Sequence, residues 1–248
     1  MICLVLAAGY ATRLYPLTEN FPKPLLKVGE KTILNWLLDD IDQDPAVTSH
    51  VIISNHRYAG HFRQWAAQQH YRCPVTILDD GSCDNEHRLG AVADIAFVID
   101  QLQLHDDLLI IAGDNVLDFS LREFMAFAAH KQSSCVMCHE ENDPHRQRRT
   151  AIITRDNNGL VMSFEEKPAN PKGNLAVPPF YFYTADDAAR VHDAISNGCG
   201  IDAPGSFAAW LISKTSMYAW KMPGKRYDIG NIESYRHACS IFSAAKQG

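Results

Sequence analysis

Long hydrophobic runs are missing from this chain of 248 residues. The apolar stretch near its start, residues 2–8, is far shorter than the roughly 20 residues that cross a bilayer. No positively charged segment precedes that stretch, so neither a membrane span nor a signal peptide is expected. The 7 cysteines are an odd set with irregular spacing, which does not predict a disulfide framework. A reducing compartment is favoured, and we expect a cytoplasmic protein.

A strong excess of one charge is also lacking. The chain carries 23 Lys and Arg against 29 Asp and Glu, a net charge of −6, which argues against a general binder of nucleic acid or anionic membrane. Hydrophobic residues make up 46% of the chain and charged residues 21%, which is typical of a globular protein and excludes collagen and wholesale disorder. Because no repeat, low-complexity segment or flexible linker interrupts the chain, we expect one domain over residues 1–248.

The first half of the chain alternates between two kinds of segment. Apolar runs typical of buried strands cover residues 2–6, 51–53, 75–78 and 108–112, and segments of helical periodicity cover residues 33–41, 58–69 and 91–102. Strands that are buried on both faces and joined by helices form parallel sheets. We therefore predict an α/β fold, a Rossmann-like, doubly wound and mostly parallel sheet in a three-layer sandwich.

The rhythm changes after Gly113, and the sheet is expected to be mixed in the second half. Strands are predicted over residues 134–138, 151–154, 160–164 and 180–184, and helices over 121–130, 185–196, 207–211 and 231–245. The step Asn157-Asn158-Gly159 predicts a hairpin turn between two of these strands.

The segment that follows the first strand carries the clearest chemical signal. Small residues lead to Gly9 and then to Arg13, and Lys23 lies between two prolines. Small side chains let backbone N–H groups approach a phosphate chain, and two cations suit a polyphosphate. Neither G-x-x-x-x-G-K-[ST] nor G-x-G-x-x-G is present, which argues against the two common nucleotide-binding loops. A tight turn with a surface arginine is the alternative.

Asp114 lies just past the strand at 108–112, where the carboxyl ends of a parallel sheet place ligands. A turn or helix-capping role for this aspartate is the alternative. Asp228 precedes a glycine turn. Two such carboxylates suit Mg²⁺, which prefers oxygen ligands.

Several motifs together resemble those of the sugar-1-phosphate nucleotidylyltransferases, the group that includes the glucose-1-phosphate thymidylyltransferases. In chain order they are Gly9–Arg13 with Pro16-Leu17-Thr18 and Pro22-Lys23-Pro24, then Leu89-Gly90-Ala91, Ala112-Gly113-Asp114-Asn115, Phe164-Glu165-Glu166-Lys167-Pro168, and Tyr227-Asp228-Ile229-Gly230 with Glu233-Ser234-Tyr235. The resemblance extends along nearly the whole chain.

The resemblance implies roles for individual residues. Nucleotide binding is assigned to Leu6, Ala8, Gly9, Tyr10, Ala11, Thr12, Arg13 and Gly90, sugar-phosphate binding to Lys23, Glu166 and Lys167, catalysis to Arg13, Lys23 and Asp114, and Mg²⁺ binding to Asp114 and Asp228. It also implies a nucleotide-binding half at about residues 1–115 and a sugar-phosphate-binding half at about 116–248.

The implied reaction joins a nucleoside triphosphate, with dTTP or UTP favoured, to a sugar 1-phosphate and releases pyrophosphate. A cytidylyltransferase acting on a non-sugar phosphate or phosphonate is the main alternative, followed by a glycosyltransferase of related fold. The expected partners are these small-molecule substrates, with neither nucleic acid nor membrane, and a homo-oligomer remains open.

Three positions depart from the family pattern. Ala11 replaces a loop glycine, a change that keeps the backbone approachable. Thr150-Ala151 stands where a glycine usually lies beside the sugar, and Pro178-Pro179 replaces a common Thr-Gly pair. The last two changes concern the acceptor, so the motifs leave the identity of the sugar open, and the identity of the nucleotide base is equally open.

Three other clusters are predicted to be structural. Cys135-Val-Met-Cys138-His139 has the spacing of a haem or zinc motif, but it lies in a predicted strand and reads as core cysteines. Asp40-Ile-Asp42 resembles a D-x-D metal motif, but it ends a predicted helix and is expected to be solvated. The basic run from His145 to Arg149 reads as a surface loop, with a phosphate contact from Arg149 as the alternative.

Overall fold

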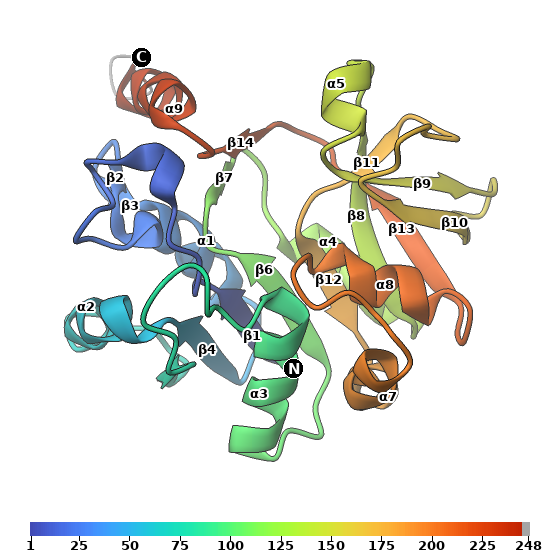
Figure 1. Ribbon diagram of the computed structural model, residues 1–248, viewed down its shortest axis with the longest axis horizontal. Helices are drawn as coiled ribbons and strands as arrows, with labels where there is room; N and C mark the ends of the chain where they lie inside the picture. The colour runs from blue at the N-terminus through green and yellow to red at the C-terminus, as the bar shows by residue number, and fades with distance from the viewer. Residues whose placement is uncertain (245–248) are drawn as a thin grey trace. The chain divides into compact units, whose positions relative to one another are not determined.

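The computed structural model describes residues 1–244, which form two compact units (Figure 1). Unit 1 contains Met1–Ile2, Leu89–Ile111 and Glu123–Met222, and unit 2 contains Cys3–Arg88, Ala112–Arg122 and the chain from Pro223 onward. Each unit therefore draws on both halves of the sequence. The single domain divided near residue 115 stays a prediction.

Unit 2 is built on parallel strands joined by helices. The strands β1 (Ile2–Leu6), β4 (Ser49–Ser54) and β5 (Val75–Asp79) are neighbours in that order, and β4 and β5 are parallel. The helices are α1 (Ile33–Ile41), α2 (His56–Ala66) and α9 (Ile232–Ala244). Two short ladders pair β2 (Lys27–Val28) with β3 (Lys31–Thr32), and β7 (Asn115–Leu117) with β14 (Arg226–Asp228).

Unit 1 holds a mixed sheet. Its strands, in spatial order, are β10 (Val161–Glu166), β9 (Ala151–Arg155), β11 (Leu175–Val177), β8 (Ser134–Glu140), β12 (Phe180–Tyr183) and β6 (Leu108–Ala112). These neighbours are antiparallel, whereas β13 (Met217–Lys221) joins β8 in parallel. The helices are α3 (Ala91–Leu102), α4 (Arg122–Lys131), α5 (Pro144–Gln147), α6 (Ala185–Ala188), α7 (Val191–Ser196) and α8 (Gly205–Leu211).

The predicted α/β class, with parallel strands early and a mixed sheet later, is confirmed. The hairpin between β9 and β10 turns at Gly159, whose φ of 86° is favourable only for glycine. The single helix predicted over residues 185–196 is wrong: the chain forms α6 and α7 with a break at Arg190. The last helix ends at Ala244, and the predicted residue 245 lies outside the described residues. No helix within residues 1–244 is both long and apolar enough to span a bilayer.

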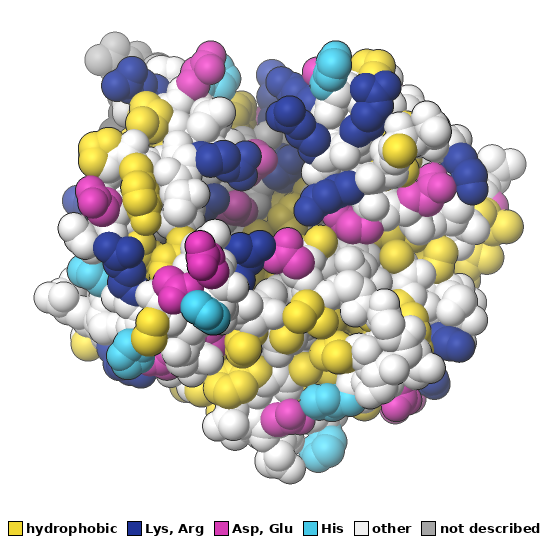
Figure 2. Space-filling model, viewed as in Figure 1, with side chains coloured by type: hydrophobic (Ala, Val, Ile, Leu, Met, Phe, Trp, Pro, Cys, Tyr) yellow, Lys and Arg dark blue, Asp and Glu magenta, His cyan; other side chains and the backbone are white. Residues whose placement is uncertain are grey.

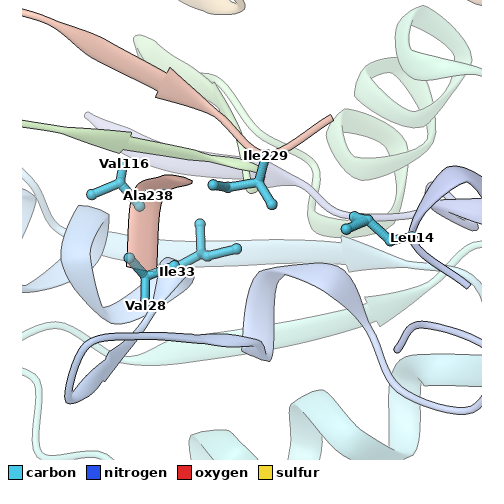
Figure 3. Close-up of a cluster of buried hydrophobic side chains, with 6 residues drawn as sticks. All are labelled: Leu14, Val28, Ile33, Val116, Ile229 and Ala238. Carbon is cyan, nitrogen blue, oxygen red and sulfur yellow. The ribbon is translucent and has the colours of Figure 1, made fainter. Parts of the chain in front are cut away.

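A cluster of buried aliphatic side chains lies at the ladder of β7 and β14 in unit 2 (Figure 3). Its members are Leu14, Val28, Ile33, Val116, Ile229 and Ala238. Two of them directly follow candidate site residues in sequence, since Leu14 follows Arg13 and Ile229 follows Asp228, and Val116 lies two residues after Asp114. Packing of this cluster therefore fixes the backbone from which the neighbouring polar side chains project.

Truncation of the cluster tests this role. Ile229 is 0% exposed, so Ile229→Ala leaves a cavity and should lower the free energy of unfolding by about 2–5 kcal/mol. Urea unfolding followed by circular dichroism measures the change. Ile201→Ala, at a side chain that is 44% exposed, is the matched control and should have a much smaller effect. Equal destabilisation by the two variants would contradict the assignment.

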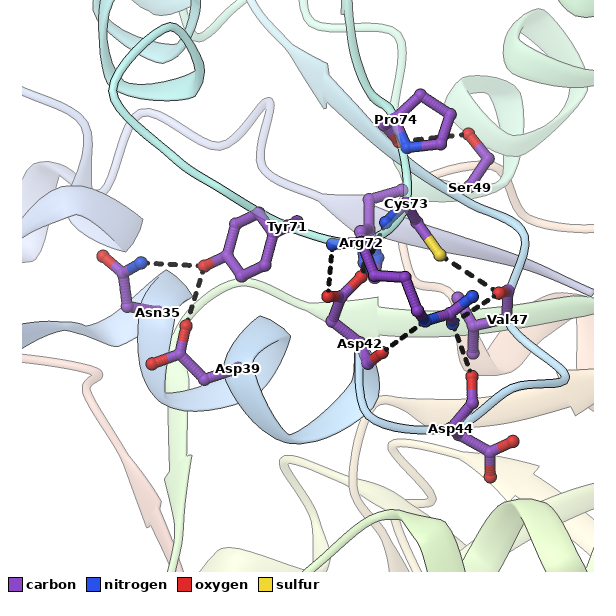
Figure 4. Close-up of polar contacts among 11 residues, drawn as sticks. Asn35, Asp39, Asp42, Asp44, Val47, Ser49, Tyr71, Arg72, Cys73 and Pro74 are labelled. Carbon is purple, nitrogen blue, oxygen red and sulfur yellow. Dashed lines mark hydrogen bonds and ion pairs between the residues drawn. The ribbon is translucent and has the colours of Figure 1, made fainter.

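A buried polar network joins the end of α1 to β4 and to the segment before β5 (Figure 4). Asp42 Oδ1 lies 2.9 Å from His50 Nε2 and accepts from Cys73 N at 3.0 Å, while Oδ2 accepts from Arg72 N at 2.7 Å. The Arg72 guanidinium donates to the Val47 carbonyl at 2.8 Å. The expectation that Asp42 ends a solvated helix terminus is thus wrong, because folding recruits its carboxylate to satisfy buried N–H groups.

The network also shifts the pKa values of its members. Burial would raise the pKa of Asp42, but hydrogen bonds from Arg72, His50 and Cys73 outweigh burial and lower the pKa from 3.8 to about 2. Burial lowers the pKa of His50 from 6.5, although the neighbouring Asp42 carboxylate opposes that shift. In the native state His50 is therefore neutral and Asp42 is ionised near pH 7.

These shifts predict a loss of stability on acidification. Below the ordinary pKa of 6.5, His50 in the unfolded chain binds a proton that the buried ring resists. Acidification therefore stabilises the unfolded state and lowers the free energy of unfolding. Between pH 3.8 and about pH 2 the same argument applies to Asp42, and the free energy of unfolding falls by a further ~2 kcal/mol. Urea unfolding at a series of pH values measures both steps.

His50→Gln is the informative variant for the first step, and His70→Gln, at an exposed histidine, is its control. The decline in stability as the pH falls below about 6.5 should be reduced in the first variant and retained in the second. An identical decline in both would show that His50 is not responsible.

Candidate functional site

Hydrogen bonds to its carbonyl groups and from one aromatic side chain fix the loop after β1 to the rest of the protein. Asn55 Nδ2 donates to the Ala8 carbonyl at 2.9 Å, and Thr18 Oγ1 donates to the Ala11 carbonyl at 2.8 Å. The Tyr10 hydroxyl donates to the Ser82 carbonyl at 2.9 Å. The loop is therefore rigidly anchored, and the Tyr10 side chain is directed into the protein, which leaves only its backbone for a ligand.

The other side of the loop offers N–H groups. Within residues 1–244, the backbone N–H groups of Gly9, Tyr10 and Ala11 donate to no protein acceptor. A Cβ built at Gly9 meets open space, and Thr12 and Arg13 are exposed. Satisfied carbonyls on one side and available N–H groups on the other are what an anion-binding loop requires.

The backbone at Ala11 is left-handed, with a φ of 48°. This conformation costs an L-residue roughly 1–2 kcal/mol relative to the right-handed region. Alanine is therefore a less neutral replacement for glycine here than the sequence suggests. The hydrogen bond from Thr18 to the Ala11 carbonyl is one of the contacts that hold the residue in place.

The two predicted carboxylates lie side by side in unit 2. In the antiparallel ladder of β7 and β14, Asp228 pairs with Asn115, and Ile229 N donates to the Asp114 carbonyl at 2.9 Å. More than a hundred residues of sequence separate the two strands. The ladder, rather than any local motif, brings Asp114 next to Asp228.

Lys23 completes this arrangement. Its ammonium donates to Asp114 Oδ2 at 2.8 Å and to the Ile229 carbonyl at 3.1 Å. The approach depends on Gly113, because a Cβ there would lie 3.0 Å from the Pro24 ring. Glycine at 113 thus lets the Pro22-Lys23-Pro24 segment pack close to the backbone just before Asp114, with Lys23 against Asp114.

The electrostatics of the pair follow from these neighbours. Burial would raise the pKa of Asp114, but the Lys23 ammonium and the Arg226 guanidinium more than offset it, and the pKa lies below its ordinary value. The surrounding protein displaces solvent and raises the pKa of Asp228, and the charge of Asp114 raises it further. Arg226, Lys23 and Arg13 oppose the shift at Asp228 only in part.

These residues fit a divalent cation. The charge of Asp114 raises the pKa of Asp228, and a cation bound by both carboxylates would reduce the repulsion between them. Carboxylate oxygens suit hard cations, and the Asp228 side chain keeps 53% of its area exposed. Within residues 1–244, the only cluster of three or more His, Cys, Asp or Glu ligand atoms is Asp42, His50 and Cys73, so protein atoms alone do not complete a coordination shell at Asp114 and Asp228.

Of the three residues predicted to bind the sugar phosphate, Glu166 and Lys167 lie together in unit 1, whereas Lys23 belongs to unit 2. Glu166 ends β10 and pairs with Ala151, and Lys167 N donates to the Thr150 carbonyl at 3.2 Å. The Glu166 carboxylate occupies the space that a Cβ at Gly205 would need. Burial raises the pKa of Glu166, and the Lys167 charge lowers it in part.

Both departures from the family pattern in the acceptor region meet at these same strand ends. Val177 of β11 pairs with Ala151 of β9, so Pro178 follows beside Thr150. Neither Pro178 nor Pro179 has a backbone N–H. The edge that carries Glu166 and Lys167 thus lacks two donors that other residue types would provide.

Gly90 precedes α3 in unit 1 with a φ of 96°, and a Cβ there would lie 2.7 Å from the Ile201 carbonyl oxygen. The first two N–H groups of the helix, from Ala91 and Val92, donate to the carbonyls of Asp202 and Ile201 at 3.3 and 2.8 Å. Glycine is therefore required by this packing, and those two N–H groups are already used.

The two remaining clusters form no group of three metal-ligating side chains within residues 1–244. Cys135 and Cys138 are free, buried thiols on β8. The residues around α5 are exposed, and Figure 2 shows Lys and Arg side chains gathered there. Arg146 lies 3.7 Å from Asp143 and 3.8 Å from Glu141.

Sequence reasoning assigned no role to two residues that contact the carboxylates. Asn115 Nδ2 donates to Asp114 Oδ1 at 2.6 Å, and Arg226 Nη1 donates to Asn115 Oδ1 at 2.6 Å. Asn115 was visible only as part of a motif. Arg226 has no local signal at all, because its importance arises from the pairing of β14 with β7.

Comparison with known proteins agrees with the motifs. The family model described as nucleotidyl transferase matches residues 2–243. The chain is 25% identical over 242 residues to a UTP–glucose-1-phosphate uridylyltransferase of Haloferax volcanii, covering 94% of this chain and 93% of the relative. It is 26% identical over 249 residues to a glucose-1-phosphate adenylyltransferase of Fervidobacterium nodosum, covering 95% of this chain but 59% of that relative. The chain thus spans about three fifths of the adenylyltransferase.

Solved structures show the same fold. A UDP-glucose pyrophosphorylase complexed with UDP-glucose matches with a TM-score of 0.83 and 19% identity over 99% of both chains. A UDP-glucose pyrophosphorylase from Acinetobacter baumanii matches with a TM-score of 0.81 and 15% identity, over 100% of this chain and 95% of that one. The resemblance inferred from the sequence motifs is confirmed by the family match over residues 2–243, and the chain belongs to the nucleotidyl transferase family.

Proposed function

We propose that the protein transfers a nucleotidyl group from a nucleoside triphosphate to a phosphorylated small molecule and releases pyrophosphate. The observation that carries this proposal is the β7–β14 ladder, which sets Asp228 beside Asp114 with Lys23 in contact. Paired carboxylates with adjacent cations are suited to handling polyphosphate. The anchored loop at Gly9–Arg13 in the same unit supports triphosphate binding.

A sugar 1-phosphate is the favoured acceptor, with dTTP or UTP as the favoured nucleotide. Family membership supports the class of reaction. The proline pair at 178–179 keeps the alternative of a cytidylyltransferase that acts on a non-sugar phosphate or phosphonate, because it removes two donors beside Glu166 and Lys167. Lys167 would bind the acceptor phosphate, and Glu166 would accept a hydrogen bond from an acceptor hydroxyl.

The proposed reaction is an in-line displacement at the α-phosphorus. An acceptor phosphate is already an anionic nucleophile, so a strong general base is unnecessary. The N–H groups of the loop and the Arg13 guanidinium would bind the triphosphate and stabilise the charge that develops on pyrophosphate. The Lys23 ammonium favours the ionised form of Asp114. By family resemblance, Lys23 and Lys167 would each contribute positive charge that attracts the incoming phosphate. Asp114 and Asp228 would hold Mg²⁺, which neutralises phosphate charge when bound.

A pyrophosphate-release screen tests the function. Purified protein with Mg²⁺ is incubated with ATP, CTP, GTP, UTP or dTTP and with hexose 1-phosphates, phosphorylated amino alcohols or phosphonates. We expect release that depends on both substrates and is greatest with dTTP or UTP and a hexose 1-phosphate. Release only with CTP and a non-sugar acceptor would select the alternative. Consumption of a nucleotide sugar without pyrophosphate release would overturn the proposal in favour of a glycosyltransferase.

Removal of the loop cation should affect turnover but not folding. Arg13 is exposed, so Arg13→Ala should leave thermal unfolding unchanged while lowering kcat/KM about 10²–10³-fold, the usual effect of losing one charge-stabilising donor. Arg63→Ala removes an exposed arginine on α2 and is the control. Comparable activity of the Arg13 variant and the wild type would remove Arg13 from the site.

A further inference from the structure

Arg226 connects the two carboxylates through a chain of contacts in unit 2. Its Nη1 donates to Asn115 Oδ1 at 2.6 Å, and the Asn115 amide donates in turn to Asp114 Oδ1 at 2.6 Å. The same Nη1 lies 3.8 Å from Asp228 Oδ2, which is longer than a hydrogen bond but within ion-pair distance. Asn115 is fully buried, and the Arg226 side chain is 19% exposed, so the orientation of Asp114 Oδ1 is coupled to Arg226.

Strand geometry puts Arg226 in this place. Arg226 and Asp228 are two residues apart on β14, so their side chains leave the same face of the strand. The facing strand supplies Asn115 opposite Asp228. The guanidinium is therefore held by a neutral amide at a fixed distance from Asp228, rather than being bonded to that carboxylate.

The charges in contact at this ladder balance. Asp114 and Asp228 supply two negative charges, Lys23 and Arg226 supply two positive ones, and Arg13 adds to the positive field at Asp228. A free divalent cation entering this set meets no net attraction, because the resident cations offset the two carboxylates. A cation that arrives with a polyphosphate brings an excess of negative charge, which the same resident cations attract.

We propose that Arg226 is a resident counter-ion and positioning residue that makes the carboxylate pair select a divalent cation bound to polyphosphate over the free cation. Asn115 transmits the position of Arg226 to Asp114. The inference rests on the proposed function only in taking the pair as the place where metal and triphosphate meet.

Binding of Mn²⁺ to the full chain tests the proposal without any turnover. Free Mn²⁺ is titrated by electron paramagnetic resonance, and binding of preformed Mn²⁺–tripolyphosphate, which has no base, is measured by calorimetry. Arg226→Met should bind free Mn²⁺ about ten-fold more tightly and the tripolyphosphate complex about ten-fold more weakly than the wild type. The opposite directions are the signature of a charge that discriminates between the two forms.

Two further variants separate charge from structure. Arg226→Lys should restore the wild-type preference at least in part, because it returns the charge. Lys225→Met removes an exposed positive charge from the adjacent residue and should shift neither affinity by more than about two-fold, because exposed charges are screened by solvent. If Arg226→Met does not fold, Arg226→Gln, which keeps an amide donor for Asn115, takes its place with the same expectation.

A purely structural arginine would give a different result. Its loss would weaken binding of both forms of Mn²⁺ or change neither, and either outcome overturns the proposal. Failure of the proposed reaction is distinguishable, because it would appear as absent pyrophosphate release with every triphosphate while the Mn²⁺ measurements are made independently.

Discussion

Two carboxylates on neighbouring strands repel each other, and the ladder between β7 and β14 forces them together. The rest of unit 2 is arranged around that constraint. Lys23 contacts one carboxylate directly, and Arg226 lies between the other and the amide of Asn115. The aliphatic cluster beneath the ladder supplies the packing energy that keeps the strands paired against this repulsion. A folded chain can tolerate such a concentration of charge only because opposite charges are built in beside it.

The loop at Gly9–Arg13 is also held by contacts that leave its ligand-binding groups available. Its carbonyls are satisfied by Asn55 and Thr18, and the backbone at Ala11 is held in a left-handed conformation. An anion-binding surface needs donors that have no partner in the protein, and such donors are stable only at an exposed surface or beside a ligand. The fixed carbonyls therefore explain how the loop can present N–H groups without collapsing onto its own backbone.

Much of the fold could be predicted from local pattern. Helix α1 combines a Thr32 cap with apolar residues at helical spacing, and the Asn-Gly step marks the turn between β9 and β10. The strands β7 and β14 escaped prediction because each has three residues, too few for a periodic signal. The break between α6 and α7 was missed because residues 185–196 keep apolar spacing on both sides of Arg190.

Some residues of the candidate site could likewise be predicted from local sequence, and others could not. Residue types alone singled out Gly9, Arg13, Lys23 and Asp114, since small residues, cations between prolines and an acid after a buried strand are local features. Asp228 was reached only by family resemblance, and the roles of Asn115 and Arg226 came from the structure. Tertiary pairing also turned Asp42 from an expected surface acid into a buried acceptor. Local sequence determines which groups are present and how the chain turns around them. The partner of each charge is decided by folding, because an electrostatic contact depends on distance in space, which strand register sets between residues far apart in the chain.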